Sequence, residues 1–183
     1  MATMATHSSD SLTSSAHNAD TGKSASIGLA VLRITLGVII LVTWWGNIAD
    51  DLYTSDGLTG FFNWLFTSGD DGGNGSTLSF YNTLANNTLL KAGGLFGTLQ
   101  LVIEGLVGLA LLLGAFTRAA ALAAVIFFFN LFLAYFGGNE WIWTYVILGA
   151  SSLAVFLGYA GRTFGLDNFL VHRFGHSPAD LLW

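Results

Sequence analysis

Two residues that could take part in acid–base or ion-pair chemistry, Arg33 and Glu104, lie within stretches of sequence that are otherwise apolar. A charge at bilayer depth costs about 2.5–3.5 kcal/mol on insertion scales, so it usually faces the inside of a helix bundle and has a partner. Arg33 and Glu104 are the only charged residues in the four long apolar runs of the chain, and their signs are opposite. We therefore expect each to be the partner of the other and to line a site within the membrane.

Several other chemistries lack the residues that they need. The chain has no cysteine, which excludes a disulfide, an iron–sulfur cluster and a thiolate nucleophile. The histidines lie outside the apolar runs, so none of them can hold a haem between the spans. Metalloprotease helix motifs and phosphate- or dinucleotide-binding glycine loops are missing. We expect no haem, iron–sulfur cluster or metal.

The composition indicates which elements must position the two charges. Hydrophobic residues make up 53% of the 183 residues and charged residues only 9%, whereas about 25% of a typical soluble domain is charged. Each apolar run is close to the roughly 20 residues with which a helix crosses about 30 Å of hydrocarbon. The sequence therefore predicts an all-α membrane protein with a four-helix transmembrane bundle. The four runs are 26–45, 93–116, 119–136 and 141–159.

Helical spacing places the polar residues of the first two runs on defined faces. Arg33 and Gly37 share one face of the first run, and Gln100, Glu104 and Gly108 share one face of the second. Small residues on such faces let two helix backbones approach closely in a membrane. From the rise per residue, Arg33 and Glu104 differ in depth by about 8 Å, which their side chains could bridge directly or through one water.

The distribution of basic residues predicts the orientation. Lys23 precedes the first run, Arg118 lies between the second and third, and Arg162 and Arg173 follow the fourth. The positive-inside rule places this side in the cytoplasm. We expect a multi-pass protein of the cell membrane with both termini cytoplasmic.

The same pattern divides the chain into parts. We predict a disordered polar tail over 1–25, a transmembrane domain over 26–160 and a cytoplasmic interfacial segment over 161–183. A long external loop over 46–92 connects the first two spans. This loop contains two candidate glycosylation sequons, at Asn74 and Asn86.

Three segments resemble the DoxX/DoxD family of small four-helix membrane proteins: LRITLGVII, IEGLVGLALLLGAFTRAAA and GYAGRTFGLDNFL. The resemblance covers about 27–170, and the long external loop is similar to the DoxD branch, the small subunit of a thiosulfate:quinone oxidoreductase. Where many relatives have a lysine after the first span, this chain reads WWGNIADD, so a function of that lysine does not carry over. The family pattern matches Arg33, Gly37, Glu104, Gly108, Gly114, Thr117, Arg118, Gly161, Arg162, Gly165 and Asp167.

The terminal motif also has a reading of its own. Asp167 is a suitable N-cap for the segment DNFLVHRF. That segment mixes aromatic and aliphatic residues with His172 and Arg173, as a helix at the membrane interface does.

Three functions remain open at this point. In the first, suggested by the resemblance, Arg33, Gln100 and Glu104 supply hydrogen bonds and a proton route to a non-covalently bound quinone, and a partner chain carries the substrate site. In the second, the chain is a non-catalytic anchor or assembly subunit, and the Arg33–Glu104 pair locks the bundle. In the third it transports a small solute as an oligomer. The expected partners are membrane lipid and other membrane subunits or further copies of the chain, and not nucleic acid.

Overall fold

The computed structural model describes residues 5–175 and 182, with side chains from residue 21 onward. All regular elements in this part of the chain are helical, which confirms that the protein is all-α; the four-helix transmembrane bundle stays a prediction. Seven α-helices are joined by short turns, among them the one-turn elements η1 (Gly69–Asp71), η2 (Ala85–Leu89) and η3 (Ala160–Arg162). The α-helices are α1 (Ala5–Ala49), α2 (Ser55–Phe66), α3 (Ser79–Leu84), α4 (Gly93–Leu113), α5 (Thr117–Ala134), α6 (Trp143–Leu157) and α7 (Leu166–Phe174).

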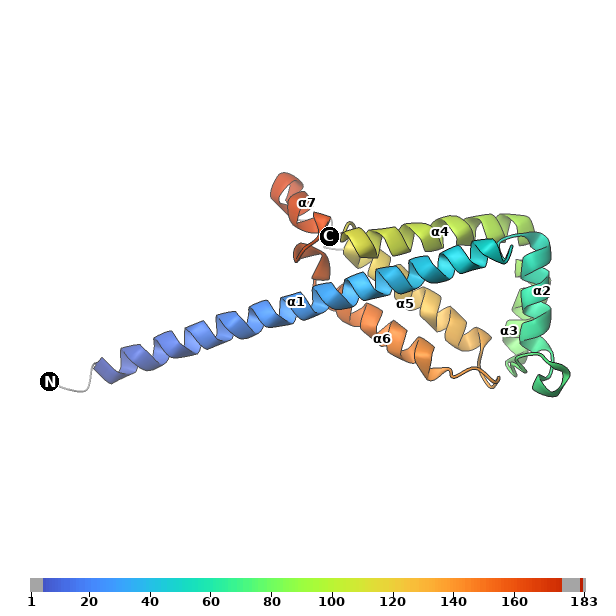
Figure 1. The fold of residues 1–183 in the computed structure, drawn as a ribbon, viewed down its shortest axis with the longest axis horizontal. Coiled ribbons are helices and arrows are strands. Elements are labelled where there is room, and N and C mark those ends of the chain that lie inside the picture. Colours follow the sequence, from blue (N-terminus) through green and yellow to red (C-terminus); the bar gives the residue numbers. More distant parts are fainter. Residues whose placement is uncertain (1–4, 176–181, 183) are drawn as a thin grey trace.

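Four of these helices form two packed pairs. Helix α1 runs along α4 and α5 runs along α6, and the pairs are joined by contacts of α4 with α5 and of α1 with α6. The pairs diverge toward the end of the molecule at which α2 and α3 lie (Figure 1). At the other end they are close together, around a buried core that includes Leu36, Leu111 and Val155.

Within the residues that the structure describes, three stretches of helix are long and apolar enough to cross a membrane: Thr21–Ala49, Gly93–Leu113 and Thr117–Ala134. Their outward faces carry exposed aliphatic side chains such as Val31, which is 58% exposed, and Leu106, which is 61% exposed. Such side chains are suited to contact with lipid. The fourth predicted run forms α6, which has 15 residues and is therefore about 22 Å long.

Helix α1 begins before the first apolar run. It is helical from Ala5, where the sequence predicts a polar tail over 1–25. The division of the chain at residue 25 stays a prediction.

Glycines set the register between α1 and α4. Gly37 and Gly108 are buried where the two helices meet, as their predicted faces require. A Cβ atom on Gly37 would lie 2.6 Å from the backbone nitrogen of Leu112, closer than real Cβ atoms come. The two backbones are therefore in direct contact, and the contact fixes how far α1 extends along α4.

The long loop packs over the diverging ends of the helices. Helices α2 and α3 bury Leu58, Phe62 and Tyr81 in a second apolar cluster with Ala134 of α5. Asn74 joins this loop to the α5–α6 turn, since its backbone carbonyl accepts from the amide of residue 139.

The two sequons lie in different surroundings. Asn74 is 1% exposed, its Nδ2 donates to Ser76 Oγ at 2.8 Å, and its Oδ1 accepts from the Glu140 amide at 3.2 Å. Asn86 is exposed. Glycosylation stays a prediction at both positions, and at Asn74 it would have to precede folding.

Candidate functional site

Arg33 lies at one end of the helix pairs, away from α2 and α3. Its side chain is completely buried, and its guanidinium donates to the backbone carbonyls of Leu111 at 2.6 Å, Leu112 at 3.1 Å and Phe164 at 3.1 Å. The first two carbonyls belong to the last turn of α4, where carbonyls lack partners within the helix and the helix dipole favours a cation. Arg33 therefore closes the end of α4 and ties it to the segment before α7.

The expectation that Arg33 and Glu104 are partners is wrong. The contact of Gly37 with Leu112 places Arg33 level with the end of α4, whereas Glu104 lies about two turns earlier on that helix. Backbone carbonyls take the place that we assigned to a carboxylate. Arg33 is consequently outside the site that contains Glu104.

Asp167 is the acidic residue near Arg33. It is 1% exposed, and its carboxylate accepts from the backbone N–H groups of Phe116 at 2.7 Å and Thr117 at 3.0 Å. It therefore caps the start of α5 and not its own helix, for which Gly165 is the N-cap. Burial raises the pKa of Asp167, and the hydrogen bonds from Thr117 and Phe116 and the charge of Arg33 oppose this shift.

Several of the residues that match the family pattern converge at this end. A Cβ atom on Gly161 would overlap both the Asp167 carboxylate and the Thr117 hydroxyl, so only glycine lets η3 lie against them. The amide of Asp167 also donates to the carbonyl of Gly114 at 2.8 Å. We call this cluster of Arg33, Gly114, Thr117, Gly161 and Asp167 the latch.

Two further arginines border the latch. The guanidinium carbons of Arg118 and Arg162 lie 4.2 and 4.3 Å from the centroid of the Tyr159 ring, and Arg118 Nε donates to the carbonyl of Phe156 at 3.2 Å. These contacts hold the end of α6 against the start of α5. They place two partly buried cations at this end of the molecule.

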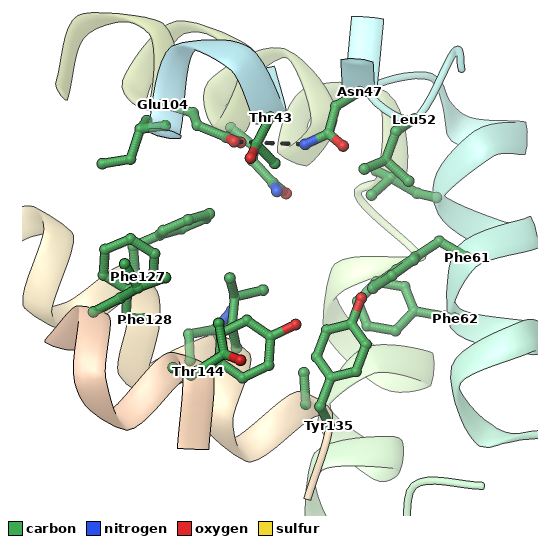
Figure 2. Close-up of a pocket in the computed structure, with 18 of the residues that line it drawn as sticks. Thr43, Asn47, Leu52, Phe61, Phe62, Glu104, Phe127, Phe128, Tyr135 and Thr144 are labelled. Atoms are coloured by element: carbon green, nitrogen blue, oxygen red, sulfur yellow. Dashed lines mark hydrogen bonds between the residues drawn. The ribbon is translucent and has the colours of Figure 1, made fainter. Parts of the chain in front are cut away.

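Glu104 lies on a cavity at the opposite end of the bundle. The cavity has a volume of about 520 Å³ and is lined by residues of all six helices α1 to α6. Figure 2 shows Glu104, Thr43 and Asn47 on one side of it, Phe127 and Phe128 on a second, and Phe61, Phe62, Tyr135 and Thr144 on the others. Of the predicted site residues, Glu104 and Gln100 therefore line this cavity and Arg33 does not.

Glu104 is held by two side chains from the end of α1 and the turn after it. It is 4% exposed; its Oε2 accepts from the Tyr53 hydroxyl at 2.8 Å and its Oε1 from Asn47 Nδ2 at 3.5 Å. Asn47 Nδ2 also donates to Tyr53 Oη, at 3.2 Å. Burial raises the pKa of Tyr53, so the phenol stays protonated near neutral pH and remains a donor to Glu104.

Sequence analysis did not identify Tyr53 or Asn47. Asn47 lies 14 residues after Arg33 on α1, about 21 Å along the helix axis, and Tyr53 lies in an irregular turn whose path helical spacing does not predict. The available signal was the density of polar side chains directly after the first apolar run. The turn lies directly against the backbone of α4 at Gly97, because a Cβ atom there would overlap the Tyr53 carbonyl.

The wall opposite Glu104 is built from aromatic side chains. The Tyr135 and Tyr145 rings stack with centroids 5.2 Å apart, and the Tyr81 hydroxyl donates to Asn130 Oδ1 at 3.0 Å. All four of these side chains line the cavity. The cavity thus has a small polar wall that contains a carboxylate and a large aromatic wall across from it.

These features define a class. The chain is a helical membrane protein in which apolar helices enclose a cavity with one buried carboxylate.

The comparisons with known proteins give the family. The family described as "TQO small subunit DoxD" matches residues 77–183, more than half of the chain, and the chain therefore belongs to the DoxD family. The matched range includes Gln100, Glu104 and Asp167 and leaves out Arg33 and Tyr53. The comparisons with curated proteins and with solved structures gave no match.

Proposed function

We propose that the chain is the membrane subunit of a thiosulfate:quinone oxidoreductase, the enzyme that the family description abbreviates as TQO, and that the Glu104 cavity binds the quinone ring. The observation that carries this proposal is the position of Glu104: a buried carboxylate, held by a phenol, that faces a cavity between apolar helices. A carboxylate of this kind within a membrane protein is typical of proton-transfer sites.

The cavity fits a quinone head group. Its volume of about 520 Å³ lies within the roughly 300–1,000 Å³ of small-molecule sites, which combine apolar walls with a few polar groups. The amide of Gln100 can donate to a ring carbonyl, and the rings of Tyr135 and Phe127 can lie against a ring face. Glu104 and Gln100 would hold the head group.

The residues of the polar wall then have separate tasks. A bound quinone supplies the redox chemistry, since it becomes a quinol by taking up two electrons and two protons. Glu104 Oε1 and Oε2 hold or release a proton beside the ring. The Tyr53 hydroxyl and Asn47 Nδ2 keep the carboxylate in place through both states.

We further propose that α6 is a fourth span and that the latch faces the cytoplasm. Arg118, Arg162 and Arg173 lie at the latch end, and acidic residues dominate the loop that contains α2 and α3. The positive-inside rule supports this orientation. The cavity then opens toward the outer half of the membrane.

Replacement of Glu104 tests the proposed function. Glu104→Gln keeps the size of the side chain and removes its charge, and it should abolish quinone-linked turnover while the protein still assembles in the membrane. Asp56→Asn, an exposed carboxylate away from the cavity, is the matched control and should keep wild-type turnover. Wild-type turnover in Glu104→Gln would contradict the proposal.

The latch supports a second candidate, a non-catalytic anchor or assembly subunit. The Arg33 guanidinium donates to backbone carbonyls of Leu111, Leu112, Thr163 and Phe164, so this residue serves the fold. Under this alternative, Arg33→Met should lower the amount of protein in the membrane and of any chain that copurifies with it, and Glu104→Gln should change neither these amounts nor turnover.

A further inference from the structure

The charged residues that line the cavity have one sign. Among the residues that the structure describes there, only Asp50 and Glu104 are charged, and both are acidic. Glu104 is buried on the inner wall and Asp50 is exposed, so one negative charge lies deep in the cavity and the other where it meets solvent.

Basic side chains are committed to other places. The Arg33 guanidinium is bound by carbonyls at the end of α4, and Arg118 and Arg162 stack on Tyr159 at the latch. Lys91 is exposed between η2 and α4 and does not line the cavity. An anion that entered would therefore meet two carboxylates and no compensating cation.

The rest of the wall favours an uncharged ring. Phe61, Trp64, Phe127, Tyr135 and Tyr145 contribute aromatic surface to the cavity, and aromatic faces carry partial negative charge. In a low-dielectric cleft lined by one sign of charge, repulsion of ions of that sign is strong. A planar ring with neutral oxygen acceptors escapes this repulsion and still meets a donor at Gln100.

We infer that the cavity selects neutral planar ring compounds and rejects anions by charge, which makes Asp50 and Glu104 determinants of specificity. This inference rests on the proposed function and names its substrate class. Thiosulfate is a dianion, so the electron donor of the proposed reaction does not enter the cavity. Its binding surface lies elsewhere, and the cavity receives only the quinone.

A pair of ligands with the same ring tests the inference. We would measure equilibrium binding of anthraquinone sulfonamide, which is neutral, and of anthraquinone sulfonate, which is anionic and nearly the same shape, to the full-length chain in a non-ionic detergent. Dialysis with absorbance detection of the ring gives both affinities without turnover. The neutral sulfonamide should bind at least about tenfold more tightly than the sulfonate. Added salt should reduce this difference in affinity, because it screens the repulsion between charges.

Two variants assign the selection to the cavity. Asp50→Asn removes an exposed charge at the cavity and should strengthen sulfonate binding by about threefold without changing sulfonamide binding. Asp71→Asn removes an exposed charge in η1 that does not line the cavity, and it should change neither affinity.

The outcomes separate the two proposals. If the two compounds bind with equal affinity, the cavity binds quinone rings but does not select by charge, and the inference is overturned while the proposed function stands. An unchanged sulfonate affinity in Asp50→Asn would also overturn the role of that residue. If neither compound binds, the proposed quinone site is itself wrong and the inference falls with it.

Discussion

Arg33 and Glu104 look alike in sequence, as single charges in apolar runs, but they have different surroundings. Arg33 is enclosed by carbonyls of α4 and of the segment before α7. Glu104 has one side against Tyr53 and the other toward a cavity. A charge whose partners are all backbone atoms stabilises the fold, whereas a carboxylate beside open space is available for chemistry.

Tyr53→Phe tests the support of Glu104. The substitution removes the hydroxyl that donates to Glu104 Oε2 at 2.8 Å and leaves the ring in place. A hydrogen bond to a charged group contributes about 1.5–3 kcal/mol, so quinone-linked turnover should fall by about tenfold or more and its pH profile should shift. Tyr159→Phe, the matched control, keeps the ring on which Arg118 and Arg162 stack and should leave turnover and its pH profile unchanged. The same pH profile in Tyr53→Phe and wild type would contradict this role of Tyr53.

Asp167 should make stability depend on pH. Burial raises its pKa above the usual 3.8, so the folded state holds the proton more tightly than the unfolded state does. Its contribution to stability is therefore fully present below pH 3.8 and is lost as the pH rises through the higher folded-state pKa. Denaturant unfolding in detergent should show the wild type losing free energy of unfolding over this range relative to Asp167→Asn, and a pH-independent difference between the two would contradict the assignment.

At the scale of helices, glycine contacts decide which residues meet. Spacing alone predicted that Gln100, Glu104 and Gly108 share a face of α4; Glu104 and Gly108 are buried and Gln100 is partly buried. It could not predict the register of α1 against α4, because the contact of Gly37 with Leu112 depends on the backbones of both helices. Backbone carbonyls carry no signature in the sequence, so the partner of Arg33 was out of reach.

Contacts between separate elements were also beyond prediction from the sequence. Asp167 caps α5 from another element, and Tyr53 reaches Glu104 from an irregular segment. Both contacts join residues about 50 positions apart, and periodicity within one helix contains no information about them. The all-helical class was predictable from composition and the length of the apolar runs. The shared face of Gln100 and Glu104 was predictable because it follows from spacing within a single helix.

Gly97→Ala tests whether the α4 backbone positions Tyr53. The new methyl group would overlap the Tyr53 carbonyl and push the turn away from Glu104. We expect turnover to fall about as far as in Tyr53→Phe, with the protein still present in the membrane. Gly94→Ala is the matched control on the same helix: its methyl group would meet only Ser55 Oγ, at 3.4 Å, and it should behave as wild type. Equal turnover in the two variants would contradict the positioning role.

The whole molecule has two unlike ends. The latch end is closed by hydrogen bonds between α4, α5 and the segment around α7 and carries arginines. The other end carries α2 and α3 (Figure 1), residues of both line the cavity, and the loop there is acidic. One end therefore holds the helices together, and the other contains the cavity that we propose as the quinone site.

We proposed that the latch faces the cytoplasm. Because the sequence has no cysteine, single introduced cysteines can test this orientation. Asp70→Cys and Asn168→Cys place single thiols at exposed positions in η1 and α7. With a membrane-impermeant maleimide, Asp70→Cys should be labelled in intact cells and Asn168→Cys only after permeabilisation. The reverse pattern would show that the latch faces outward.

The proposal that the Glu104 cavity binds quinone is tested most directly by photoaffinity labelling with an azido-quinone, followed by mass spectrometry of the labelled peptides. We predict labels on residues that line the cavity, such as Asn47, Phe61 and Tyr135. These labels should be lost on competition with unmodified quinone and in Glu104→Gln. A second groove, on the outer face of α1 and α4 around Val38 and Leu109, is apolar and open. Labels confined to that groove, or equal labelling of the cavity in Glu104→Gln, would contradict the assignment of the Glu104 cavity as the quinone site.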